Sequence, residues 1–207
     1  MKDTSIIQRS LVILKPDAIQ RGIVGELITR FERKGLKMVA MKIVQPTVEM
    51  ARKHYDKDDA WCEEIGKKSI RPAFEEQGLE FKWASDLEAG REALQTLIDY
   101  LSCGPVVVMV LEGGLAIKHI RSMVGYRDPI DADIGTIRAD YTIESAYMAN
   151  SLGRSVRNMV HASGEPEEAE QEIALWFKPE ELCSYDLAIE KILYDREWEQ
   201  MRREINE

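Results

Sequence analysis

The sequence predicts an α+β fold, one domain in which a layer of helices covers a small sheet. Two observations lead to this prediction. Short apolar runs that end near proline or glycine alternate with stretches whose apolar residues recur every three to four positions. The chain has 207 residues, of which 44% are hydrophobic, and this is enough to bury a core in a chain between one large domain and two small ones in length.

The first predicted elements are two strands and two helices. Residues 11–14 are apolar and are followed by Pro16, which cannot donate a hydrogen bond to a neighbouring strand, so a buried strand ends there. Apolar residues four positions apart predict a helix within residues 23–35, with a glycine at its end. Residues 36–44 predict a second strand, and residues 47–55 a shorter helix.

The strongest strand follows a less regular stretch. Residues 56–84 are charged and weakly patterned, which predicts an excursion from the main fold with at most one short helix. Ser85 begins a capping-box pattern, and an apolar stripe then predicts a helix that stops at Gly104. Residues 105–111 are almost all apolar, which predicts a strand buried on both faces, and a helix follows over residues 114–125.

The last third of the chain predicts shorter elements. Residues 125–135 read as a loop, residues 145–152 as a short helix and residues 156–160 as a brief edge strand. Residues 167–177 predict a helix, because Pro166 is favoured in a first turn and apolar residues follow on one side. Residues 186–204 predict a charged amphipathic helix.

Composition excludes several classes of protein. The formal net charge of −9 disfavours binding to a nucleic-acid backbone or to an anionic membrane surface. No apolar run approaches the roughly 20 residues that span a bilayer, and no secretory signal is visible at the N-terminus. Three cysteines without a CxxC pair predict neither a disulfide framework nor a zinc cluster, so we expect a cytoplasmic location.

A histidine and a glutamate are predicted to meet near the end of the chain. The strand at residues 156–160 would deliver His161 to its C-terminal end, where a neutral imidazole keeps one nitrogen free as a nucleophile. Glu172 lies about 9 Å along the next helix, and helical side chains lean toward the N-terminus, so it could orient the imidazole. From these residues alone, His161 could equally be a residue that only caps a strand.

Three cations are candidates for binding phosphate. Lys15 ends the first strand, Arg121 lies on a predicted helix and Arg138 follows a loop. Together they could hold a polyphosphate, although each could also be an ordinary solvated charge. The sequence contains neither a GxxxxGK[ST] nor a GxGxxG motif, so the phosphate loops of those folds do not apply.

An ordered set of short motifs resembles the nucleoside diphosphate kinase family. The resemblance covers most of residues 8–55 and 97–185. The motifs that support it are Lys15-Pro16-Asp17 with Gln20-Arg21-Gly22, His54-Tyr55, Gly104-Pro105-Val106, Gly135-Thr136-Ile137-Arg138, Asn158-x-x-His161-x-Ser163, Trp176-Phe177 and Pro179-Glu180-Glu181-Leu182.

The resemblance implies a ferredoxin-like antiparallel sheet covered by helices, and a ping-pong transfer of the γ-phosphate between nucleoside triphosphates and diphosphates. It implies that His161 is phosphorylated, that Glu172 orients it and that Ser163 bonds to that glutamate. Mg²⁺ is expected on the nucleotide's phosphates, with little direct ligation by the protein. The residues that match the family's phosphate and ribose contacts are Lys15, Tyr55, Arg121, Arg138 and Asn158, and those near the base are Leu97 and Val156.

The chain departs from the family pattern in two stretches and at two residues, of which one is Ala162, in place of the glycine expected after the histidine. Residues 56–84 and about 142–154 are expected to be insertions in a single domain of residues 1–207. The family's base-stacking phenylalanine should lie in the first stretch, where Trp61 is the first candidate replacement and Phe74 the second. Arg127 stands where a phosphate-contacting threonine is expected, and it could bind phosphate or point outward.

Two functions remain open at this level. The complete set of site residues favours a nucleoside diphosphate kinase that works as a homo-oligomer, a tetramer or hexamer. The altered positions leave an alternative, a nucleotide-binding or protein-phosphohistidine regulatory module with weak nucleotide exchange. The extension at residues 186–207 is longer than a minimal domain needs, and it predicts a packing or oligomer helix with Trp198 as its anchor.

Overall fold

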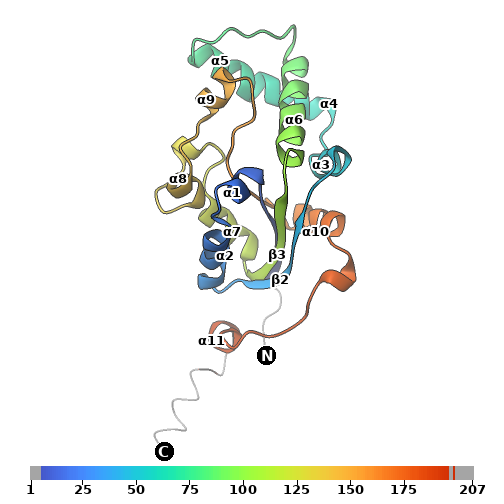
Figure 1. The fold of residues 1–207 in the computed structure, drawn as a ribbon, viewed down its shortest axis with the longest axis vertical. Helices are drawn as coiled ribbons and strands as arrows, with labels where there is room; N and C mark the ends of the chain where they lie inside the picture. Colours follow the sequence, from blue (N-terminus) through green and yellow to red (C-terminus); the bar gives the residue numbers. More distant parts are fainter. Residues whose placement is uncertain (1–5, 196–197, 199–207) are drawn as a thin grey trace, which may run out of the picture.

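The centre of the fold is a four-stranded antiparallel sheet with the strand order β2-β3-β1-β4 (Figure 1). The computed structural model of the chain describes residues 6–195 and residue 198. The strands are β1 (Ile7–Leu14), β2 (Lys37–Val44), β3 (Val106–Gly114) and β4 (Val160–Ala162). The sheet confirms the predicted ferredoxin-like α+β class.

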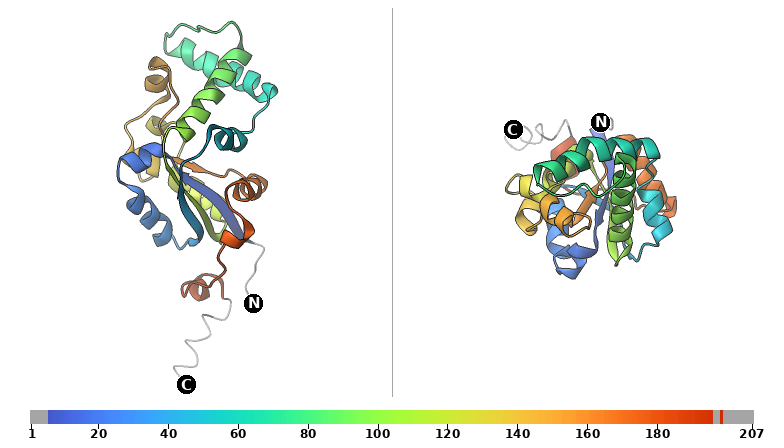
Figure 2. Two further views of the ribbon diagram at one scale, coloured as in Figure 1. Left: turned by 45° about the vertical axis from the view of Figure 1, so that its right-hand side comes forward. Right: turned by 90° about the horizontal axis from the view of Figure 1, so that it is seen from above.

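The helices surround this sheet on both faces and extend beyond one of its ends (Figures 1 and 2). In chain order they are α1 (Pro16–Gln20), α2 (Val24–Arg33), α3 (Val48–His54), α4 (Asp59–Ile65), α5 (Arg71–Glu76), α6 (Asp86–Ser102), α7 (Ala116–Val124), α8 (Ile137–Tyr141), α9 (Ala146–Ser151), α10 (Pro166–Trp176) and α11 (Glu190–Tyr194).

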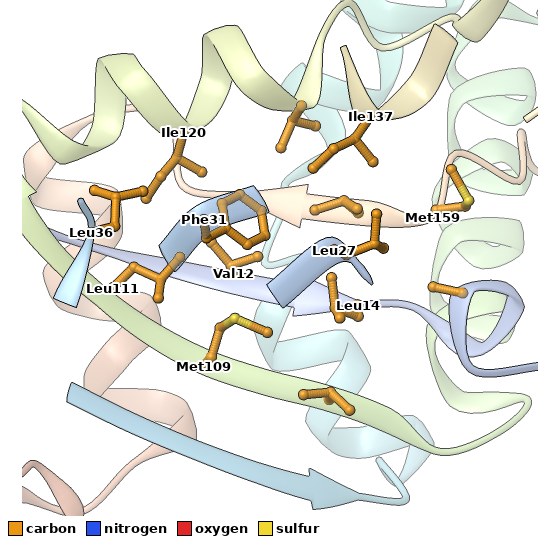
Figure 3. Packing of buried hydrophobic residues seen from close by; sticks show 14 of the residues in the cluster. Val12, Leu14, Leu27, Phe31, Leu36, Met109, Leu111, Ile120, Ile137 and Met159 are labelled. Carbon is orange, nitrogen blue, oxygen red and sulfur yellow. The ribbon is translucent and has the colours of Figure 1, made fainter. Parts of the chain in front are cut away.

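Strand β3 is buried on both faces, as its unbroken apolar run predicts. Successive side chains of a strand point to opposite faces, so Val107, Met109 and Leu111 enter one core while the valines between them enter the other. The first core lies under α2 and α7, and Figure 3 shows Phe31 at its middle. The second core lies under α3, α6 and α10, where Trp176 is buried. Both cores hold β1 and β3 in place beneath the functional residues.

The stretch at residues 56–84 contains more helix than its sequence pattern predicts. Helices α4 and α5 are joined by a π-helical turn over Gly66–Ile70, and in Figure 1 they lie with the first half of α6 at the far end of the molecule from α11. Asp58 caps α4, because its side chain accepts a hydrogen bond from the amide of Trp61. This cap, rather than apolar periodicity, marks the start of α4.

The predicted brief edge strand is present, but its predicted bounds, residues 156–160, are wrong. Strand β4 begins only at Val160, so that His161 lies inside the strand, opposite Ile13 of β1. The preceding residues turn tightly, because the amide of Asn158 donates to the carbonyl of Val156 and Met159 has a φ of 59°. The carbonyl of Met159 accepts a hydrogen bond from the amide of Lys15 at 2.7 Å, which ties this turn to the end of β1.

The C-terminal helix is also shorter than predicted within the described residues. Helix α11 covers Glu190–Tyr194, whereas residues 186–189, where the prediction began, are not helical. Residues 196–197 and 199–204 of the predicted helix lie outside the described residues. Trp198 is 43% exposed on the single chain, so it does not anchor the helix by packing within that chain. Tyr194 has that role instead, since its hydroxyl accepts a hydrogen bond from the amide of Gly114 at 2.8 Å. In the described part of the chain, no helix has the length and apolar character needed to cross a membrane.

Replacing Gly90 by alanine should destabilise the protein. Helices α4 and α6 cross so closely that a Cβ on Gly90 would lie 1.9 Å from the carbonyl oxygen of Cys62. We expect the free energy of unfolding to fall by about 1–3 kcal/mol, the usual cost of overpacking. Urea denaturation of Gly90→Ala measures this. Gly25→Ala is the matched control, because a Cβ there meets nothing within 4 Å, and equal losses in both variants would contradict the prediction.

Candidate active site

The imidazole of His161 is held by a chain of hydrogen bonds that starts in the sheet. The amide of Leu11 in β1 donates to Oγ of Ser163 at 3.1 Å, and this hydroxyl donates to Oε2 of Glu172 at 2.6 Å. The other oxygen of Glu172, Oε1, lies 2.7 Å from Nε2 of His161. Helix α10 supplies Glu172 and β4 supplies His161, so the packing of this helix on the sheet fixes the ring.

This geometry determines which nitrogen of His161 is free. A carboxylate can only accept, so the imidazole proton lies on Nε2 and the lone pair on Nδ1. Burial, followed by the charge of Lys15, lowers the pKa of His161 to about 3, so that the ring is neutral at pH 7. Burial raises the pKa of Glu172, and its bond to Ser163 opposes that shift. The side chain of His161 is still 18% exposed and can be reached by a ligand.

A cavity of about 300 Å³ opens beside His161 and is lined by three arginines, Arg121, Arg127 and Arg138. The other lining residues are Val124, Gly125, Tyr126, Ala162 and Glu168. Guanidinium groups bind phosphate oxygens with paired donors, so this cavity suits a polyphosphate. The structure therefore brings Arg127 to the same cavity as the two arginines that the sequence singled out.

Arg138 is fixed in place by three backbone carbonyls. Its guanidinium donates to the carbonyl oxygens of Gly125 at 2.9 Å, Asn158 at 3.3 Å and Val160 at 2.7 Å. Burial and the nearby charge of Arg121 lower its pKa to about 10, so it remains a cation at neutral pH. The arginine thus joins the loop after α7 to the turn before β4, and holds the wall of the cavity.

Lys15 and Asn158 form a second polar pair next to the histidine. The ammonium of Lys15 donates to Oδ1 of Asn158 at 2.8 Å and lies 5.0 Å from the centre of the Tyr100 ring. The amide nitrogen of Asn158 in turn donates to the carbonyl of Arg127 at 3.0 Å. Burial, followed by the charge of Arg138, lowers the pKa of Lys15 to about 7.

Two neighbouring residues at the end of α3 close the other side of His161. The hydroxyl of Tyr55 is buried and has no hydrogen-bond partner among the described residues, as expected for a group that could bond to a ligand. The His54 ring packs edge-on against the His161 ring, with 4.5 Å between ring centres. The sequence interpretation favoured Tyr55 and missed the contact of His54, although the adjacent His-Tyr pair was visible.

The residues expected to contact the nucleotide base do not lie with the residues around His161. Trp61 on α4, Leu97 on α6 and Val156 before β4 are each partly exposed, and none of them lines the cavity around His161. Phe74 is buried against Phe81 and Trp83, which makes it a core residue of its own segment. Tyr126, which was not predicted, is 55% exposed and lines the cavity.

The fold and the site together are those of a phosphotransferase, since a neutral imidazole lines a cavity together with three arginines. A family model described as nucleoside diphosphate kinase matches residues 8–61 and 70–182. The chain belongs to the nucleoside diphosphate kinase family.

Known relatives agree in sequence over most of their length. The nucleoside diphosphate kinase of Pyrobaculum aerophilum is 44% identical over 180 residues, which is 85% of this chain and 98% of the relative. The enzyme of Listeria monocytogenes is 40% identical over 184 residues, 89% of this chain and 98% of the relative.

Solved structures agree in fold. An NDP kinase from Pyrobaculum aerophilum superposes with a TM-score of 0.82 at 41% identity, over 86% of this chain and all of that one. A transition-state mimic of the Borrelia burgdorferi nucleoside-diphosphate kinase, with bound vanadate and ADP, gives 0.75 at 33% identity, over 90% of this chain and 96% of that one.

The amine of Lys15 should titrate near pH 7 in the free protein. Its ordinary pKa of 10.5 is lowered because burial and the charge of Arg138 both disfavour the ammonium form. Between pH 7 and pH 10.5, Lys15 of the unfolded chain holds a proton that the folded chain has lost. The free energy of unfolding therefore rises with pH across this window. Carbon-13 shifts of the lysine Cε carbons against pH measure the midpoint, and Lys15→Met identifies the signal. A midpoint above pH 9.5 would contradict the prediction.

Proposed function

We propose that this protein is a nucleoside diphosphate kinase that moves the γ-phosphate of a nucleoside triphosphate such as ATP to a nucleoside diphosphate, with His161 as the phosphorylated intermediate. The observation that carries this proposal is the bond between Glu172 and Nε2 of His161, because it leaves Nδ1 with a lone pair beside three arginines. The family membership and the vanadate-bound relative support the same activity.

The transfer takes place in two similar steps. The lone pair of Nδ1 forms a bond to the γ-phosphorus, and the bond from that phosphorus to the bridging oxygen breaks, so the diphosphate leaves with the electron pair. The imidazole gains positive charge as the new bond forms, and the carboxylate of Glu172 stabilises that charge. A second diphosphate then attacks the phosphorus through its terminal oxygen and restores the neutral imidazole.

The cations around the site neutralise the phosphates during transfer. Phosphoryl transfer depends mainly on positioning and on charge stabilisation, so Arg121, Arg127 and Arg138 would bind the phosphate oxygens. Lys15, Tyr55 and Asn158 would hold the ribose and the adjoining phosphates. The negative charge of a bound nucleotide favours the ammonium form of Lys15, so nucleotide binding and protonation of this lysine support each other.

Mg²⁺ fits this site as a part of the substrate. Mg²⁺ prefers oxygen ligands, and within the described residues the one cluster of three possible metal ligands is His54, His161 and Glu172, whose atoms already bond to one another and to neighbours. Glu168, the carboxylate that lines the cavity, accepts a hydrogen bond from the amide of Gly164. The ion would therefore be held by the phosphate oxygens and would shield their charge.

The remaining assignments complete the proposal. The chain would form a single domain over residues 1–207 with insertions at about residues 56–84 and 142–154. It would act in the cytoplasm as a homo-oligomer, a tetramer or hexamer, on free nucleotides rather than on nucleic acid or membranes. Leu97, Val156 and Trp61 remain the candidates for contact with the base. They do not line the cavity around His161, so the base would have to extend beyond that cavity or these residues would have to move toward it.

Incubation with radiolabelled ATP and Mg²⁺ should place an acid-labile phosphate on the protein, and GDP, CDP or UDP should remove it. His161→Asn should abolish labelling, because no other described histidine exposes a nitrogen to the arginine-lined cavity. Absence of label on the unchanged protein would disprove the proposal. Labelling with turnover many decades below ~1–10³ s⁻¹ on free diphosphates would favour the alternative, a regulatory phosphohistidine module.

Glu172→Gln should slow the transfer by about a hundredfold, within the 10²–10⁴ range of acid–base and orienting groups. The glutamine keeps the shape of the carboxylate but loses the charge that stabilises the developing imidazolium. Ser163→Ala should slow the transfer much less, because it removes only one of the hydrogen bonds that hold the carboxylate of Glu172. Single-turnover phosphorylation rates measure both variants, and an equal loss in the two would contradict this order.

A further inference from the structure

A second histidine shares the buried environment of the nucleophile. His54, at the end of α3, has a fully buried side chain that packs edge-on against His161. Its Nδ1 lies 3.7 Å from Oε1 of Glu172, the same oxygen that bonds to His161. Glu172 therefore has two imidazoles within reach. Catalysis by His161 requires that Glu172 accepts a hydrogen bond from His161 and not from His54.

Trp176 determines which proton state His54 adopts. The indole Nε1–H of Trp176, the last residue of α10, donates to Nδ1 of His54 at 3.3 Å. An accepting Nδ1 has no proton, so the proton of the neutral ring lies on Nε2, which has no partner among the described residues. The other tautomer would set an N–H against the indole N–H and leave the buried indole without an acceptor.

We propose that Trp176 is a positioning residue. Its indole N–H keeps His54 in the Nε2–H tautomer, so that Glu172 accepts a hydrogen bond from His161 alone. This inference rests on the proposed function. Without the indole N–H, the Nδ1 of His54 would be free to carry a proton and to donate it to Glu172, over a gap that a small rotation closes. His161 would then lose the acceptor that fixes its own tautomer.

The charges around His54 keep its ring from binding a second proton. His161 of β4, Lys15 after β1 and Lys57 after α3 disfavour that second proton, and Glu172 of α10 favours it. Burial is the largest effect, and together they lower the pKa of His54 to about 3. A variant in which His54 bonds to Glu172 would bind its second proton more readily, so that its activity would be lost at a higher pH than that of the unchanged protein.

The test compares Trp176→Phe with Trp83→Phe in the full-length protein. Trp83 is the matched control, because its indole also donates to a side chain, Glu92, but in the α5–α6 segment away from His161. Nitrogen-15 NMR of labelled histidines reports the tautomer of His54, and single-turnover phosphorylation by ATP and Mg²⁺ reports the rate. We expect Trp176→Phe to move the His54 proton to Nδ1 and to slow phosphorylation about tenfold, with the loss steepest at acid pH. Trp83→Phe should change neither.

A double-mutant cycle separates this role from simple packing. In a His54→Phe background, or in His54→Leu if the first fails to fold, no imidazole competes for Glu172, so adding Trp176→Phe should have little further effect. The same tenfold loss in both backgrounds, or an unchanged tautomer in Trp176→Phe, would overturn the inference. An unchanged protein that takes no phosphate at His161 would instead overturn the proposed function, and the NMR result would still decide the tautomer.

Discussion

The hydrogen bond between Glu172 and His161 is the interaction on which the rest of the site depends. It requires a helix, α10, to be held against β1 and β4 so closely that a carboxylate meets a strand residue at 2.7 Å. The second core provides that contact, since Ile173 and Trp176 of the same helix are buried in it. Ser163, whose hydroxyl accepts from the amide of Leu11, donates to the other carboxylate oxygen, so the orientation of the His161 ring is tied to the sheet itself.

A site that must neutralise phosphate has to keep several cations close together before any phosphate arrives. The structure limits their mutual repulsion in two ways. Arg138 is surrounded by backbone carbonyls, whose partial negative charges stabilise its guanidinium. Lys15 is buried deeply enough to exchange its proton near neutral pH. The site is therefore less positively charged near neutral pH than its residues suggest.

The sequence predicted the sheet and the central residues of the site well, for physical reasons that can be named. A strand such as β3 must be apolar on both faces, and Pro166 and the apolar spacing after it mark α10, so Glu172 could be aligned with His161. The sequence did not predict the turn before β4, because a non-glycine residue at positive φ leaves no local pattern. It also missed the contacts of His54 and Tyr126, since these depend on how distant elements meet.

The left-handed backbone of Met159 restricts what evolution can place at that position. This conformation costs a non-glycine residue roughly 1–2 kcal/mol, and it would be harder still for a side chain branched at Cβ. Glycine would remove the strain, but it would also remove a fully buried side chain from the first core. Long, unbranched apolar residues satisfy both demands, so the position two residues before His161 should tolerate few alternatives.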